Sequence, residues 1–399
     1  MTNTGVTTPK LPWADLWALD PAVDYLNHGS FGACPKAILD KQSELRARLE
    51  KEPMDFLVRA LPGLLAEARA ALGAFVGADG DDLALVSNAT AGVNAVLRSL
   101  AFSPGDELLT TDHAYAACKK TLDYVATRTG ARVVAAEVPF PLGAEEDVLE
   151  PVLAAVTPRT RLAMLDHVTS PTALVFPIGR LVGELSARGV DTLVDGAHAL
   201  GMAPLDLTRL GAAYYTANAH KWLCAPKSAA FLHVRKDRQK GLHPVAISHG
   251  YAGGEARFKD EFDWTGTVDP TAALCIPDCI AYLGGLLPGG WPALMETNRA
   301  LALRARAILC NALVVPPPAP ASMIGAMASV PFPAAAPGSP AQHLDREELA
   351  DWMRARGVES WFHGWPPGGG GKLVRVSAQL YNTADQFRKL AGLIAEALE

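Results

Sequence analysis

Short apolar runs and longer amphipathic segments alternate along the chain from about residue 60 to residue 235. Apolar runs of about four to eight residues are typical of buried strands, and apolar residues repeated every three or four positions are typical of helices. The predicted strands are 83–87, 107–111, 132–138, 162–166, 192–195, 213–216 and 229–234. The predicted helices between them include 114–128, 146–156 and 178–188. This alternation predicts an α/β fold whose mostly parallel central sheet has helices on both faces.

A second, smaller pattern begins after residue 270. It predicts a helix over 291–312, a strand over 322–330, a helix over 345–356 with Asp345 as its N-cap, a strand over 372–378 and a closing helix over 385–398. We therefore expect a small α+β domain at the C-terminus. The predicted division is an N-terminal segment 1–30 that contributes to the active site, a large domain 31–270 and a small domain 271–399.

Composition and charge exclude several classes of function. Lys and Arg number 36 against 42 Asp and Glu, which gives a formal charge of −6 and argues against a nucleic-acid partner. No stretch of about 20 apolar residues is free of prolines, so no membrane span is expected. The N-terminus lacks a secretory signal pattern, which predicts a cytoplasmic protein with its six scattered cysteines reduced. Cys275 and Cys279 lack a second ligand pair, so no metal site is predicted.

An aspartate and a lysine at the ends of neighbouring predicted strands carry the strongest chemical signal. Asp195 follows a run of apolar strand residues, and Lys221 follows the next predicted strand. Because parallel strands end at the same edge of a sheet, the two side chains are expected to meet there. Pyridoxal 5'-phosphate (PLP) needs a lysine that forms an imine and an acid that keeps the pyridine nitrogen protonated. Each residue alone is more often a turn or a solvated strand end, so only the pair supports a PLP site.

The turn 87–92 adds a possible phosphate site. It lies between a predicted strand and a helix and contains Asn88, Ala89 and Thr90. Small residues at the start of a helix leave backbone N–H groups free to bind an anion. A simple helix cap is the ordinary alternative, but the PLP pair elsewhere in the sequence favours phosphate binding.

Several motifs together resemble a known family. These are the turn 87–90, the Asp195 motif, residues 218–222, and the segments Leu-Asn-His-Gly-Ser-Phe-Gly at 26–32, Glu-Pro-Met-Asp-Phe at 52–56 and Thr-Asp-His-Ala-Tyr at 111–115. They are similar to fold-type I PLP enzymes of the class V aminotransferase family, in the isopenicillin N epimerase-like branch. The resemblance runs from about residue 20 to the end of the chain. It implies a PLP enzyme that acts at the α-carbon of an amino acid or peptide-like substrate.

The resemblance also implies roles for individual residues. Lys221 would bind the cofactor and move the α-proton, and Asp195 would pair with the pyridine nitrogen. An aromatic residue would cover the ring face, with His113 at the matching position and Tyr115 in reserve. The remaining cofactor contacts would come from His198 near the phenolic oxygen and from residues at the phosphate, which are Asn88, Ala89, Thr90, Asn218 and His220.

Substrate and partner contacts follow from the same resemblance. Arg375 alternates with two apolar residues on its predicted strand, so it points away from them and could hold an α-carboxylate, with Asn27 as helper and His28 nearby. In the family, the segment matching Gly266 and Thr267 comes from the neighbouring subunit and completes the phosphate site. This implies a homodimer, although an ordinary turn is an equal alternative for these two residues.

The reaction remains open between alternatives. Epimerisation is the first prediction, and a carbon–sulfur lyase acting on a cysteine derivative or its sulfoxide is the second. A PLP-binding protein without turnover is a third and weaker reading. An epimerase needs a second acid, for which His28, Tyr115 and His363 are candidates. The segment 358–371 contains no cysteine, which argues against a cysteine desulfurase, and the four glycines 368–371 belong either to a closing lid or to a surface turn.

Overall fold

The central sheet of the large domain has seven strands. The computed structural model describes residues 13–252 and 258–399. The strand order is β2-β8-β7-β6-β5-β3-β4, with β8 antiparallel to both neighbours and the strands from β7 to β4 all parallel. The strands are β2 (Leu83–Val86), β3 (Glu107–Thr111), β4 (Arg132–Ala136), β5 (Thr160–Asp166), β6 (Asp191–Asp195), β7 (Tyr214–Asn218) and β8 (Ala230–Val234). The predicted mostly parallel α/β sheet is confirmed.

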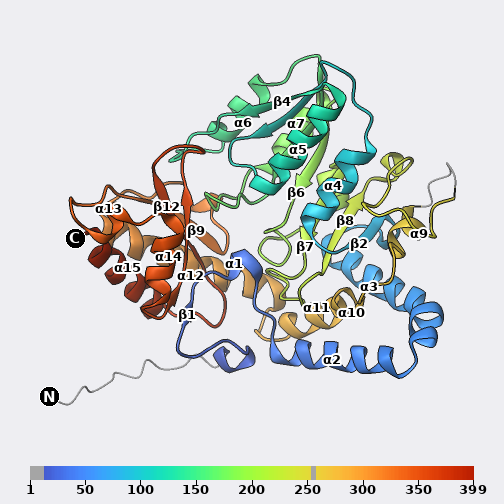
Figure 1. Cartoon of the computed structure of the whole chain (residues 1–399), viewed down its shortest axis with the longest axis horizontal. Coiled ribbons are helices and arrows are strands. Elements are labelled where there is room, and N and C mark those ends of the chain that lie inside the picture. The colour runs from blue at the N-terminus through green and yellow to red at the C-terminus, as the bar shows by residue number, and fades with distance from the viewer. Residues whose placement is uncertain (1–12, 253–257) are drawn as a thin grey trace.

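Helices cover both faces of this sheet (Figure 1). Alternate strand residues enter two separate cores. Leu109 and Val194 pack with the residues of α6 and α7, whereas Leu108 and Leu193 pack with those of α4 and α5. Burial on both faces explains why the strands are apolar without alternation. The helices of the large domain are α2 (Lys36–Lys51), α3 (Leu61–Val76), α4 (Ala89–Ser99), α5 (Ala116–Thr129), α6 (Glu146–Ala154), α7 (Ile178–Ala187), α8 (Leu207–Leu210) and α9 (Phe258–Asp263).

The C-terminal part contains a three-stranded antiparallel sheet with the order β11-β12-β9. Its strands are β9 (Met327–Phe332), β11 (Trp361–Gly364) and β12 (Lys372–Ser377). The strand predicted over 322–330 begins later, because 321–323 form a short 3-10 turn. Asp345 caps α14 through a capping box, as expected. The helices here are α10 (Thr271–Leu274), α11 (Ile276–Gly284), α12 (Gly290–Leu313), α13 (Pro340–His343), α14 (Arg346–Arg354) and α15 (Ala384–Leu398).

The N-terminal segment joins the two parts. Strand β1 (Asp24–Tyr25) pairs in parallel with β10 (Val358–Glu359), and α1 (His28–Phe31) lies between the large sheet and the small one (Figure 1). This pairing brings residues near 25 beside residues near 360, so Asn27 and Ser30 lie within reach of Arg375. The domain boundaries near 30 and 270 stay predictions.

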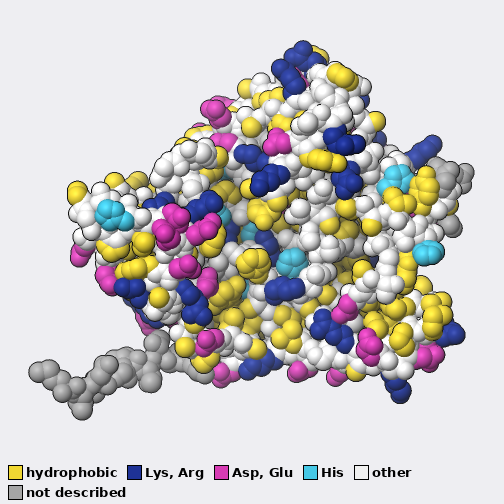
Figure 2. Space-filling view, viewed as in Figure 1, with side chains coloured by type: hydrophobic (Ala, Val, Ile, Leu, Met, Phe, Trp, Pro, Cys, Tyr) yellow, Lys and Arg dark blue, Asp and Glu magenta, His cyan; other side chains and the backbone are white. Residues whose placement is uncertain are grey.

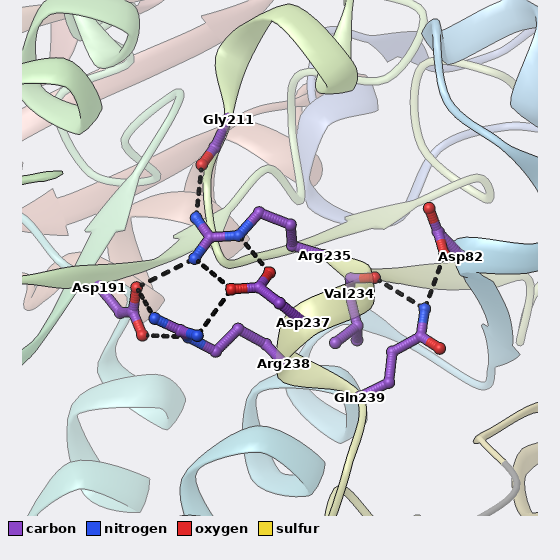
Figure 3. Close-up of polar contacts among 8 residues, drawn as sticks. All are labelled: Asp82, Asp191, Gly211, Val234, Arg235, Asp237, Arg238 and Gln239. Atoms are coloured by element: carbon purple, nitrogen blue, oxygen red, sulfur yellow. Dashed lines mark hydrogen bonds and ion pairs between the residues drawn. The ribbon is translucent and has the colours of Figure 1, made fainter.

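An ionic cluster lies at the amino end of β6, opposite the end that carries Asp195 (Figure 3). Arg238 Nε donates to Asp191 at 2.6 Å, and Arg235 Nε donates to Asp237 at 2.6 Å. Because Arg235 and Arg238 follow β8 and both pair with Asp191, they tie the end of β8 to β6. In the parts of the chain that the structure describes, no helix is long and apolar enough to cross a membrane.

Candidate active site

Asp195 and Lys221 lie at the carboxyl ends of neighbouring parallel strands. Asp195 is the last residue of β6, and Lys221 lies in the turn after β7. Their exposed fractions are 3% and 9%. Burial, and secondarily the positive charge of Arg375, lower the pKa of Lys221 to about 7. At neutral pH a large share of this amine is therefore unprotonated and available as a nucleophile or a base.

His198 is the nearest polar neighbour of the Lys221 amine. Its Nε2 lies 3.1 Å from Lys221 Nζ, and its Nδ1 is buried without a partner among the described residues. Burial, followed by the charge of Lys221, lowers the pKa of His198 well below its usual value. A neutral imidazole whose second nitrogen is unpaired and buried is open to a polar atom of a bound ligand. The contact of His198 with the cofactor stays a prediction.

Asp195 is held from two sides. Its Oδ1 accepts the Ala197 backbone N–H at 2.9 Å, and its Oδ2 accepts the thiol of Cys118 at 3.2 Å. Burial raises the pKa of this carboxyl group. A protonated ring nitrogen placed beside it would restore the ionised form, because an opposite charge favours it.

Asp166 is a second buried carboxyl group at the same edge. It is the last residue of β5, its Cα pairs with that of Asp195 across the sheet, and its Oδ2 is buried without a partner among the described residues. Sequence reasoning placed Asp166 at a strand end but gave it no role. It also missed Cys118, which lies in the first turn of α5. In the sequence, the only sign of a role for Asp166 and Cys118 was their position near the predicted ends of a strand and a helix.

The turn before α4 forms as expected, but its contacts differ in detail. Asn88 is the N-cap and accepts the Ala91 N–H at 2.8 Å. The Ala89 N–H is donated to Asn218 Oδ1 at 2.8 Å, so these two predicted phosphate ligands bind each other in this structure. Gly92 allows the close approach of α4 to β7, since a Cβ there would lie 2.3 Å from Thr216 Oγ1. Thr90 remains at the open end of the helix.

A cavity of about 760 Å³ lies beside the turn before α4, and several residues predicted to bind the phosphate line it. Asn88, Thr90, Trp264 and Thr265 line it, which brings the segment 264–268 beside the α4 turn. Thr267 is exposed. His220 Nδ1 donates to the Ala229 carbonyl at 3.0 Å, and burial lowers the pKa of His220 to about 4. A phosphate dianion near its Nε2 would oppose that shift and favour a donating imidazolium.

Arg375 is buried in a cage of oxygen atoms. Nη1 donates to the Ser170 carbonyl at 2.8 Å and to Ser170 Oγ at 3.0 Å. Nη2 donates to Ser30 Oγ at 2.8 Å and to Asn27 Oδ1 at 3.3 Å. Nε is buried and has no partner among the described residues. No acidic side chain is among these ligands, so the guanidinium keeps an uncompensated charge and an unused N–H, as a site for a substrate carboxylate requires.

The contact between Arg375 and Asn27 joins residues 348 positions apart. It agrees with the predicted pairing of these two residues. Ser30 and Ser170 were missed as ligands of Arg375, although a serine within α1 and another after β5 were visible in the sequence. Burial lowers the pKa of Arg375 to about 10, which leaves it fully charged at neutral pH.

His28 does not face the site as predicted. Its Nε2 donates to the Lys221 carbonyl at 2.9 Å, and its Nδ1 accepts the Tyr381 hydroxyl at 2.8 Å. Burial lowers the pKa of His28 to about 3, so it stays neutral. Nearby, a Cβ on Gly32 would lie 2.2 Å from the His220 carbonyl oxygen, which explains the glycine. His28 supports the backbone of Lys221 instead of binding substrate or acting as an acid.

His113 is also placed differently from the prediction. It is completely buried, donates from Nε2 to the Val138 carbonyl at 2.9 Å and accepts the Thr172 hydroxyl at 2.7 Å. Trp365 packs on it with ring centroids 4.4 Å apart. Its ring therefore has no free face for a cofactor. Tyr115, the N-cap of α5, is 44% exposed and near enough to Asp195 and Arg375 for their charges to act on its hydroxyl.

The hairpin after β11 favours the surface-turn reading over the lid. Trp365 N–H donates to the Gly371 carbonyl at 2.9 Å and closes the hairpin, while Phe362 and Trp365 are buried. His363 shares a sheet face with Arg375, because it pairs with Leu373 two residues earlier. Its Nε2 is buried without a partner among the described residues, and burial lowers the pKa of His363 to about 2.

The residues at the site fit PLP. The cofactor needs an amine and an acid, and the site offers the buried Lys221 and the carboxyl group of Asp195. It also offers the N-terminus of α4 for a phosphate and unpaired buried nitrogen atoms on His198 and Arg375. All six cysteines are buried free thiols. No group of three possible metal ligands occurs within 13–252 and 258–399.

Comparison with known proteins identifies the family. Residues 15–286 match the family described as Aminotransferase class-V. The chain belongs to this family. Its members are PLP-dependent enzymes, so the cofactor is PLP and the chain is an enzyme, as the resemblance implied. The reading as a binding protein without turnover is therefore set aside.

Class-V relatives of two activities resemble this chain over nearly its whole length. Isopenicillin N epimerase of Streptomyces clavuligerus is 35% identical, with 94% of this chain and 95% of the relative covered. Isopenicillin N epimerase of Amycolatopsis lactamdurans is 37% identical, with 95% and 96% covered. A putative L-cysteine desulfhydrase 1 of Oryza sativa subsp. japonica is 32% identical, with 94% and 83% covered. Both predicted reactions thus fit this class-V chain.

A solved structure of a cystine C-S lyase in complex with cysteine persulfide has the same fold. Its TM-score to this class-V enzyme is 0.77 at 20% identity, and the match covers 94% of this chain and 98% of the other. At this identity the likeness establishes the fold alone. The fold-type I architecture is confirmed.

Proposed function

We propose that this enzyme inverts the configuration at the α-carbon of an amino acid or a peptide-like substrate. The observation that carries the proposal is Arg375, a buried guanidinium with an unpaired Nε, in the same site as Lys221. This pairing suits a substrate with a free α-carboxylate and an α-proton. The similarity to two isopenicillin N epimerases at 35% and 37% identity supports epimerisation.

The residues of the site divide the work as follows. Lys221 holds the cofactor and, when released by the substrate amine, takes the α-proton at Nζ. Asp195 would hold the pyridine nitrogen, His198 would lie beside the phenolic oxygen, and the phosphate would be bound by Thr90, Asn88 and His220. When bound, PLP withdraws the electron pair left on the α-carbon after proton removal. The low pKa of Lys221 supports its part, because only the neutral amine accepts a proton.

Inversion requires a proton donor on the ring face opposite Lys221, and we assign that role to Tyr115. The donor must carry its proton at neutral pH. Burial, with the nearby Cys118 and Asp195, raises the pKa of Tyr115, so its hydroxyl stays protonated. His363 is the weaker candidate, since a pKa of about 2 leaves it without a proton to give. Tyr115 also takes the place over the ring face that His113 was predicted to fill.

A carbon–sulfur lyase is the second candidate. The relationship to a putative L-cysteine desulfhydrase at 32% identity supports it. In this reaction Lys221 removes the α-proton, the β-sulfur substituent leaves with the electron pair, and hydrolysis releases a keto acid and ammonia. No donor on the second face is needed, so the contribution of Tyr115 separates the two reactions.

We further propose that the enzyme is a cytoplasmic homodimer in which Gly266 and Thr267 reach the neighbouring phosphate site. Val245, Ile247 and Val268 are exposed apolar residues, and all three line or adjoin the cavity beside the α4 turn. A separate group of hydrophobic side chains lies at the lower right of Figure 2, over the region where α2 passes into α3 in Figure 1. Six free thiols suit a reducing compartment. Light scattering of the wild type and of Val268→Asp tests the dimer, which the charge should dissociate.

The decisive experiment compares wild type with Tyr115→Phe in deuterated water. With one enantiomer of an amino acid that has no β leaving group, the wild type should exchange the α-proton and racemise. Tyr115→Phe should still exchange the proton through Lys221 but retain the configuration. Release of sulfide and keto acid from L-cysteine at equal rates by both proteins, without racemisation of the first substrate, would reject the epimerase and support the lyase.

A further inference from the structure

Cys118 lies against the carboxylate that faces the cofactor ring. It is completely buried in the first turn of α5, three residues after Tyr115, and its thiol donates to Asp195 Oδ2 at 3.2 Å. The two residues are 77 positions apart in the sequence, so the contact depends on how α5 packs on the end of β6. The proposed proton transfers do not use this cysteine.

The surroundings of Asp195 explain why a donor is needed there. The carboxyl group of Asp166 is its neighbour across the sheet, and both are buried. Two carboxyl groups in one buried place resist ionisation of both. Only two donors to Asp195 occur in the described chain, the Ala197 N–H and the Cys118 thiol. The thiol therefore supplies the one side-chain hydrogen bond that favours a negative charge on Asp195.

We propose that Cys118 is a positioning residue whose thiol keeps Asp195 ionised and aimed at the cofactor's ring nitrogen. The inference rests on the proposed role of Asp195 and holds for either reaction. With the thiol in place, Asp195 has less affinity for the proton it shares with the ring nitrogen, so that proton stays on the ring. Without it, the proton moves toward Asp195, and the ring withdraws electrons less strongly.

The thiol acts as a neutral donor. Burial, and then the charges of Asp195 and Asp166, raise the pKa of Cys118 well above its usual value. A thiolate next to these carboxyl groups is therefore disfavoured, and Cys118 is no nucleophile. The other titratable groups that act on Asp195 or feel its charge are Asp166 on β5, Tyr215 on β7, Lys221 after β7 and Tyr115 before α5.

The test is a pH titration of the visible absorbance of the bound cofactor, together with its dissociation constant. Cys118→Ala removes the donor and should raise the midpoint by about half a unit or more, since a ring with less positive charge leaves the lysine-bound nitrogen more basic. It should also weaken cofactor binding by about tenfold. Cys118→Ser keeps a donor and should restore most of both values. Cys118→Val fills the space without a donor and replaces the alanine variant if that fails to fold.

Cys279→Ala is the matched control. Cys279 is a completely buried thiol on α11 in the core, so its loss should lower the melting temperature without moving the titration. An unchanged midpoint in both Cys118→Ala and Cys118→Val would overturn the proposal. Asp195→Asn distinguishes a failure of the role proposed for Cys118 from a failure of the role proposed for Asp195. If it shifts the midpoint while the Cys118 variants do not, only the role of Cys118 fails. If Asp195→Asn also leaves it unchanged, the role of Asp195 fails.

Discussion

Lys221 Nζ lies 3.1 Å from His198 Nε2, and both side chains are buried. Burial of the Lys221 amine is the main cause that lowers its pKa, and the positive charge of the nearby Arg375 is the second. The result is a lysine whose pKa falls to about 7. The lowered pKa makes Lys221 reactive before any cofactor or substrate arrives.

We expect the apoenzyme to capture PLP with a rate that rises with pH around a midpoint of about 7. Only the neutral form of the Lys221 amine attacks the aldehyde of PLP, and the fraction of this form grows as the pH rises through the pKa of Lys221 in the folded protein. Stopped-flow absorbance measures the rate. Arg375→Gln removes the second cause of the shift and should move the midpoint upward. Lys221→Ala should leave no adduct that borohydride can trap, and a wild-type midpoint near 10 would contradict the buried-lysine argument.

Arg375→Gln should raise the substrate KM by about 10- to 100-fold, because a charge-assisted pair to the carboxylate is lost. Cofactor occupancy should remain, since Arg375 contacts the substrate side of the site. Arg306→Gln is the control. Arg306 is another buried arginine, bonded to the Ala319 carbonyl at 2.7 Å, and its loss should affect stability alone. Lost PLP with an unchanged KM in Arg375→Gln would make Arg375 a cofactor residue.

Tyr115→Ala should weaken PLP binding by about tenfold, because the ring loses its stacking partner. His113→Asn should keep cofactor affinity and lose stability, since His113 bonds Val138 and Thr172 in the core. Fluorescence titration of PLP and thermal melting of both variants decide between them. Weaker PLP binding in His113→Asn with unchanged binding in Tyr115→Ala would show that His113 covers the cofactor ring.

No persulfide should form on the protein during turnover of free cysteine. All six cysteines are buried, and the segment 358–371 contains none. Burial raises the pKa of Cys118, Cys224 and Cys279, so these thiols are poor nucleophiles. Mass spectrometry after turnover is the measurement. A mass increase of one sulfur on any cysteine peptide would show desulfurase chemistry.

Asp191→Asn should lower the free energy of unfolding by about 1 kcal/mol and leave kcat and KM unchanged. Asp191 binds two arginines at the amino end of β6, the strand end opposite Asp195 (Figure 3). Chemical denaturation and steady-state kinetics on one preparation test both parts. A changed KM would mean that strain at one end of β6 reaches the other.

Much of the fold was predictable because its signals are local. The strand at 107–111 and the helix near 178–187 were found almost to the residue, since continuous apolar runs and helical periodicity both report burial. The strand at 361–364 was missed, because its alternation is broken by His363 and Gly364. The pairing of β1 with β10 was equally hidden, as it joins two segments of two residues each.

For the site, the sequence alone predicted that Asp195 and Lys221 would serve PLP chemistry, because both follow clear apolar strand patterns, and the family resemblance added Arg375. Only the tertiary structure decided which candidates face the site. His28 and His113 turn both ring nitrogens to partners in the core, whereas Tyr115 is open to the site. The contact of Cys118 with Asp195 likewise depends on packing between elements distant in sequence. Hydrophobic periodicity records which face of an element is buried, but not which of two buried polar groups meet.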